Sequence, residues 1–158
     1  MNERAERFVY LRNLRGHLRE LSVLVGRPVG KDELLTIPET RAIRARSKHV
    51  VRPAPTVFEI PFEERGGNRF ASFMARLAAA NPSNVYLWTG TTIDCGLLQG
   101  FPLMEFRVTF PFELSPNGIY SIVTTDLLDR LVLDYENRDG QQWIEVEVSG
   151  EHWGEVVY

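Results

Sequence analysis

Four carboxylates and one tryptophan near the C-terminal end form the clearest chemical pattern in the chain. They alternate with apolar residues on both sides of an Asp139-Gly140 pair, and they are Asp134, Glu136, Trp143, Glu145 and Glu147. The alternation predicts two strands, and Asp-Gly is a strong signal for a two-residue β-hairpin turn. All five side chains then lie on one side of the hairpin, which we call the hairpin face. Carboxylates clustered around an aromatic ring suit capture of a cationic protein or, where they converge on one point, binding of Mg²⁺.

The turn also fixes which residues of the two strands face each other. It places Asp134 opposite Glu145 on the hairpin face, and it gathers the apolar residues on the other side, namely Leu131, Leu133, Tyr135, Ile144, Val146 and Val148. A slip of one residue would mix the two sides, so the pattern strongly favours this register. We therefore expect the apolar side to be buried, while Asp134 and Glu145 point away from it.

Three interpretations of the hairpin face stay open at this stage. In the first it is a solvated outer surface, or a surface covered by the basic helices of the same chain. In the second it docks a basic protein, because clustered carboxylates speed the encounter with cations and an aromatic anchor holds the complex. In the third it is the metal site of a nuclease.

The nuclease interpretation rests on Asp134 and on Glu145-Val146-Glu147 in the paired strand. This arrangement resembles the hairpin of restriction-endonuclease-like enzymes, in which an Asp and a second acidic residue bind Mg²⁺. The resemblance implies Asp134, Glu145 and Glu147 as metal ligands. The sequence departs from that pattern at Glu147, where a lysine most often stands.

Charge is divided unevenly along the chain, although the net charge is only -3. Residues 1–52 contain 12 Lys and Arg against 6 Asp and Glu, whereas residues 53–158 contain 6 against 15. Two prolines, Pro53 and Pro55, break the chain at the boundary. We expect residues 1–52 to form a basic helical arm of the same domain and residues 53–158 to form an α+β body. Such asymmetry concerns association rather than fold.

The apolar spacing predicts an α+β fold, in which N-terminal helices and one middle helix pack on a mainly antiparallel sheet with a C-terminal meander. A stripe at helical spacing predicts a first helix, with the members Phe8, Leu11, Leu14, Leu18, Leu21 and Val25. A second helix is expected at residues 38–49. A core helix should follow Asn68, which we expect to be its N-cap. Further expected elements are strands at 56–62 and 85–88 and a loop at 89–102.

Apolar and polar residues alternate strictly over residues 104–114, and this pattern predicts a half-buried strand of about eleven residues. A loop at Pro116-Asn117-Gly118, with Gly118 left-handed, would fold residues 120–122 back onto residues 112–114. Pro111 is one of the residues that alternate with the apolar ones, and it has no backbone N–H to donate. It therefore favours an edge strand or a β-bulge at this position.

The segment 121–153, with the sequence SIVTTDLLDRLVLDYENRDGQQWIEVEVSGEHW, contains a Thr-Asp turn, an acidic hairpin and a closing Trp. It resembles small bacterial immunity proteins, which neutralise toxin domains of contact-dependent growth inhibition and other polymorphic toxin systems. The resemblance implies a non-enzymatic inhibitor that binds a basic toxin domain. It agrees with the docking interpretation of the hairpin face.

The sequence also argues against several classes of protein. No apolar run approaches the roughly 20 residues of a membrane span, and arginines interrupt the first 25 residues, unlike a signal peptide. We expect a cytoplasmic protein with no membrane contact and no cofactor. Nucleic acid is not expected as a partner of the protein, because the carboxylates of the hairpin face repel its backbone. Cys95 would need a histidine from elsewhere to act as a nucleophile, so a buried free thiol is the simpler expectation.

Overall fold

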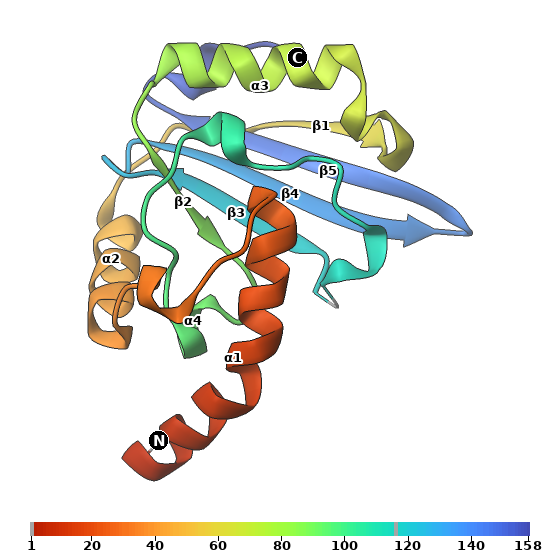
Figure 1. The fold of residues 1–158 in the computed structure, drawn as a ribbon. Helices are drawn as coiled ribbons and strands as arrows, with labels where there is room; N and C mark the ends of the chain where they lie inside the picture. The colour runs from red at the N-terminus through yellow and green to blue at the C-terminus, as the bar shows by residue number, and fades with distance from the viewer. Residues whose placement is uncertain (1, 116) are drawn as a thin grey trace.

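A five-stranded antiparallel sheet forms the centre of the molecule (Figure 1). The computed structural model describes residues 2–115 and 117–158. The strand order is β1-β5-β4-β3-β2, with β1 (Thr56–Pro61), β2 (Val85–Trp88), β3 (Ile119–Thr124), β4 (Asp129–Arg138) and β5 (Gln141–Gly150). The α-helices described are α1 (Glu3–Val25), α2 (Ile37–His49), α3 (Asn68–Ala80) and α4 (Thr92–Cys95). The predicted α+β class, with N-terminal helices and a C-terminal meander, is confirmed.

The β4–β5 hairpin has the register that the alternation predicts. Asp134 lies opposite Glu145, and Glu136 lies opposite Trp143. Both residues of the Asp139-Gly140 turn have positive φ, 52° and 84°, as a type I′ turn requires. The hairpin prediction succeeds because its turn and both of its faces can be recognised within a single local stretch of chain.

One face of the sheet is buried beneath helices and coil. The core includes the five residues for which burial is predicted from the register, each at most 5% exposed: Phe106, Phe110, Ile122, Leu133 and Ile144. The C-terminal half of α1, the apolar side of α3 and residues 103–114 contribute to the same cluster. Along β4 and β5 the burial alternates, so Asp134 and Glu145 lie on the opposite, outer face.

The predicted strand over residues 104–114 is wrong. Two short 3₁₀ helices, Leu103–Glu105 and Phe112–Leu114, flank irregular chain. The alternation in burial is real, because Phe106 and Phe110 are buried while the residues between them are not. However, β2 and β4 already occupy both sides of β3, so the segment lies against the buried face instead of joining the ladder. An extended chain that lies on a sheet face also points alternate side chains inward. The two-residue alternation is therefore the same as that of a strand, although the segment pairs with no strand.

The predicted pairing of residues 112–114 with residues 120–122 is therefore wrong as well, since β3 pairs with β2 and β4. Gly118 does have the predicted left-handed conformation, with φ 66°. A side chain at this position would meet the Tyr135 carbonyl oxygen at 2.5 Å, which is a second reason for glycine. Pro116 of the predicted loop lies outside the described residues.

The predicted helices are found, with defined ends. The Asn2 side chain accepts a hydrogen bond from the Ala5 N–H at 2.8 Å and caps α1, which ends at left-handed Gly26. α3 buries the expected apolar stripe. Its N-cap is Gly67, whereas Asn68 is the first helical residue, so the predicted cap is displaced by one position. The loop predicted at 89–102 contains the short α4.

The two N-terminal helices lie against different parts of the sheet. Leu21 and Leu24 of α1 are buried in the main core, whereas the N-terminal half of α1 extends beyond the body (Figure 1) and leaves Phe8 and Leu11 65% and 60% exposed. Only the C-terminal part of the predicted stripe is therefore buried. α2 packs Ile43 against Val123 of β3, on the outer face of the sheet. None of the described helices has both the length and the apolarity that a membrane crossing requires.

Candidate functional site

All five residues of the hairpin face lie together on the outer face of the sheet. β4 contributes Asp134 and Glu136, and β5 contributes Trp143, Glu145 and Glu147, each partly exposed. Their common side follows from strand geometry, because alternate residues of paired strands point to the same face. The grouping therefore depends on the register that the Asp139-Gly140 turn sets.

The structure adds Glu59 to this group, which the sequence analysis missed. β1 pairs with β5, and Glu59 lies directly opposite Glu145. Three carboxylates thus form one row across three strands, in the order Glu59, Glu145, Asp134. The strand at residues 56–62 is predictable, but no local pattern reveals which strand lies beside it. We call the hairpin face together with Glu59 the acidic surface.

One cation belongs to the acidic surface. Arg138, at the end of β4, pairs with Glu59 at 2.6 Å and also with Glu136. In the described part of the chain, no Lys, Arg or His nitrogen lies within 4 Å of a carboxylate oxygen of Asp134, Glu145 or Glu147. The acidic surface therefore has five carboxylates and one arginine, with three carboxylates unpaired.

Neighbouring negative charges act on Asp134. Burial raises the pKa of Asp134, and the negative charges of Glu136 and Glu147 raise it further. Like charges directly opposite each other in a sheet cost roughly 0.2–1 kcal/mol per pair. Glu145 faces a carboxylate on both sides. A cation brought to this surface would relieve that repulsion.

Trp143 stands at the edge of the acidic surface, beside an open hollow. The hollow has a volume of about 740 Å³, and its lining includes Pro61, Arg65, Gln142 and Trp143. Trp143 is partly exposed, with Glu136 on one side and Pro61 on the other. An apolar side chain of a partner can enter there while its cations meet the carboxylates.

The geometry gives no support to the alternative metal site. Within residues 2–115 and 117–158, no group of three or more His, Cys, Asp or Glu residues is arranged to hold a metal ion. Asp134, Glu145 and Glu147 are therefore not such a group: they lie side by side along the sheet and do not converge on one point. A Mg²⁺ ion needs oxygen ligands at about 2.1 Å around one centre.

The basic helical arm does not neutralise the acidic surface. The ion pairs of its arginines are Arg27 with Glu33 at 2.6 Å and Arg41 with Glu6 at 3.3 Å, both within residues 1–52. Among the residues described, no cation of 1–52 lies within 4 Å of a carboxylate of 53–158. The charge separation along the sequence therefore persists in the folded molecule.

Cys95 has the environment of a structural thiol. It is buried at the end of α4, and burial together with the charge of Asp94 raises its pKa to about 11. The thiolate needed for nucleophilic attack is thus disfavoured at neutral pH.

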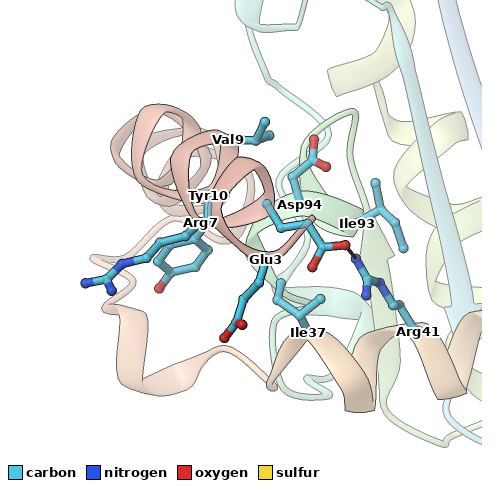
Figure 2. Close-up of a pocket in the computed structure, with 9 residues that line it drawn as sticks. Glu3, Arg7, Val9, Tyr10, Ile37, Arg41, Ile93 and Asp94 are labelled. Carbon is cyan, nitrogen blue, oxygen red and sulfur yellow. Dashed lines mark hydrogen bonds and ion pairs between the residues drawn. The ribbon is translucent and has the colours of Figure 1, made fainter. Parts of the chain in front are cut away.

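A cavity of about 360 Å³ lies between α1, α2 and α4 (Figure 2). Figure 2 shows Glu3 and Arg7 from α1, Arg41 from α2 and Asp94 from α4 around it. The ion pair of Arg41 with Glu6 already satisfies part of this charge. The mixture of both signs favours no single class of ligand, in contrast to the acidic surface.

No protein-family model, curated protein or solved structure matches the chain.

Proposed function

We propose that the chain is a non-enzymatic protein-binding module of immunity type, which captures a basic toxin domain through the acidic surface. The observation that carries this proposal is the set of three carboxylates, Asp134, Glu145 and Glu147, that have no cation within 4 Å among the described residues. A partner that places lysines or arginines against them gains Coulomb energy and also removes the repulsion within the sheet.

Two features favour a protein over a small cation as the partner. The acidic surface spans three neighbouring strands, which matches the broad, flat shape of protein interfaces better than the geometry of a metal site. Trp143 and the hollow beside it offer an aromatic anchor at the edge of the carboxylates. Aromatic residues are enriched among those that dominate binding energy. The resemblance of segment 121–153 to immunity proteins points to the same class of partner.

The protein encoded by the adjacent gene is the first candidate partner, and its affinity can be measured with purified proteins. Asp134→Lys combined with Glu145→Lys should weaken binding by at least about tenfold, which corresponds to about 1.4 kcal/mol. The matched control is Glu105→Lys with Glu113→Lys, since both residues are exposed in the segment that covers the other face of the sheet. The control changes net charge equally and should stay within about twofold of wild type.

Trp143→Ala should act differently from the charge reversals. Loss of the aromatic anchor should raise the dissociation rate. The association rate should be nearly unchanged, because it depends on the electrostatic attraction between the charged surfaces, which this substitution does not alter. Equal affinity of all these variants would refute the proposal. Metal-dependent cleavage of DNA or RNA by the wild type, abolished by Glu145→Gln, would instead establish the nuclease alternative.

A further inference from the structure

A second charged feature lies on the same outer sheet face, over β2, β3 and the start of β4. There α2 leaves a cleft of about 630 Å³ above β2 and β3. The residues that line it include Arg44, Lys48, Arg52, Trp88, Ser121 and Arg130. We call it the basic cleft. Its volume lies within the range of small-molecule sites, roughly 300–1,000 Å³.

The cations of the basic cleft come from separate parts of the chain. Arg44 and Lys48 lie one helical turn apart on α2, Arg52 follows that helix, and Arg130 belongs to β4. No acidic residue is among those that line the cleft. In the described part of the chain, none of the four cations has a carboxylate oxygen within 4 Å. The fold therefore concentrates four cations here without a direct ion pair, although the charge of Asp129 acts on Arg52 from a greater distance.

Hydrogen bonds from one guanidinium nitrogen hold Arg52 in place. Its Nη2 donates to the Leu127 carbonyl oxygen at 2.6 Å and to the Ser47 hydroxyl at 3.3 Å, which fixes the guanidinium. Its Nε is buried and has no acceptor among the described atoms. Burial and the positive charge of Arg130 lower the pKa of Arg52, and the negative charge of Asp129 offsets part of this effect.

We propose that the basic cleft binds a nucleoside phosphate, with the phosphate held by Arg44, Lys48, Arg52 and Arg130 and the base set against Trp88. Phosphate fits because it carries more than one negative charge and accepts the paired hydrogen bonds that guanidinium groups donate. The base fits because Trp88 lines the same cleft and is partly exposed. In proteins that bind single-stranded nucleic acids, aromatic side chains stack on the bases while neighbouring cations hold the phosphates. The basic cleft does not depend on the acidic surface or on its proposed partner.

Calorimetric titration of the full chain with ADP and with pyrophosphate, at low salt and without divalent cations, tests this site. We expect ADP to bind saturably, with one site per chain, and at least about tenfold more tightly than pyrophosphate because of the base. Lys48→Gln and Arg130→Gln should each weaken ADP binding by about tenfold or more. Both side chains are exposed, and neither carries a structural ion pair among the described residues.

Arg46→Gln is the matched control, because Arg46 is an exposed residue of α2 that does not line the cleft. It should leave ADP affinity within about twofold. No saturable binding of ADP would overturn the proposal, and so would equal losses in Arg46→Gln and Lys48→Gln, which would indicate diffuse attraction. Equal affinity for ADP and pyrophosphate would overturn the assignment to a nucleoside phosphate. These comparisons need only variants of exposed side chains, for which folding can be checked by thermal unfolding.

Discussion

Asp129 is a fully buried carboxylate that connects three parts of the chain. It accepts hydrogen bonds from the Asn81 side chain at 2.7 Å, from the backbone N–H groups of His152 and Trp153 at 2.8 and 2.9 Å, and from His152 Nδ1 at 2.9 Å. The end of α3, the start of β4 and the C-terminal segment are therefore fixed by one side chain. The core under the hairpin depends on this connection.

Replacement of Asp129 by Asn should destabilise the protein through lost hydrogen bonds. One carboxylate oxygen becomes an NH₂ group that faces donors, and each buried donor left without an acceptor costs roughly 1–3 kcal/mol. We expect a loss of that size or more in urea unfolding. Glu113→Gln, at an exposed site, should change the free energy of unfolding by less than about 0.5 kcal/mol. Similar values for the two variants would show that the Asp129 hydrogen bonds contribute little.

The pair of Asp129 and His152 also predicts a pH dependence. Burial raises the pKa of Asp129, but hydrogen bonds from Asn81, Trp153 and His152 outweigh this effect, so its pKa lies below the ordinary value. The hydrogen bond to Asp129 raises the pKa of His152. The Asp129 contribution is thus present above the unfolded pKa of about 3.9 and is lost as pH falls through the lower folded pKa. The His152 contribution is present below about 6.5 and is lost as pH rises through the higher folded pKa.

The difference in the free energy of unfolding between the wild type and His152→Gln gives the contribution of His152. Burial lowers the pKa of His17, whose effect on stability has the opposite sign, but His17 is common to both proteins and cancels. We expect the advantage of the wild type to be largest below about pH 6.5 and to shrink as the pH rises above this value. An advantage that is constant over this range would contradict the assignment of His152.

The strand elements differ in how well local sequence specifies them. The β4–β5 hairpin and its acidic side are predictable because the turn type and two distinguishable faces occur in adjacent residues. Residues 104–114 have an equally clear alternation, yet they form no strand. Their alternation indicates which side chains face the core. Hydrogen bonding into the sheet depends instead on whether a neighbouring strand has a free edge. Free edges are a property of the whole sheet.

Within the sheet, Gly150 is required by both conformation and space. Its φ is 131°, and an added Cβ would lie 2.5 Å from the Asp129 Cα and 2.5 Å from the Leu128 carbonyl oxygen. Gly150→Ala should therefore cost at least about 1–3 kcal/mol. Gly16→Ala is the matched comparison, because Gly16 lies within α1 with nothing within 4 Å of an added Cβ. It should stabilise the protein by roughly 0.5–1 kcal/mol in the same unfolding assay. Equal effects at the two positions would contradict the packing around Gly150.

The like-charge row predicts a gain in stability when its central member is neutralised. Glu145 lies between Glu59 and Asp134, so Glu145→Gln removes two unfavourable pairs. We expect chemical denaturation to give an increase of roughly 0.2–1 kcal/mol per pair at low salt, shrinking as salt rises. A loss of stability would show that Glu145 is not repelled by its neighbours and would remove one support for the acidic surface as a binding site.

The outer face of the sheet carries opposite charges in two regions. The acidic surface occupies β1, β5 and β4, and the basic cleft lies under α2. The charge asymmetry can be found by counting charged residues along the sequence. The four hairpin carboxylates can be assigned to one face from the register that the local turn sets. Glu59 and the convergence of Arg130 with the cations of residues 44–52 were not predictable, since they depend on strand order and on where α2 packs.

The salt dependence of the association rate constant shows whether the acidic surface captures a basic partner. It would be measured by stopped-flow mixing of the protein with the product of the adjacent gene, at ionic strengths from about 0.02 to 1 M. We predict that the rate constant of the wild type falls steeply with salt. Asp134→Lys with Glu145→Lys should be slower at low salt, with a shallower slope, and should approach the wild type at high salt. Identical rate constants and slopes for the two proteins would contradict capture through the acidic surface.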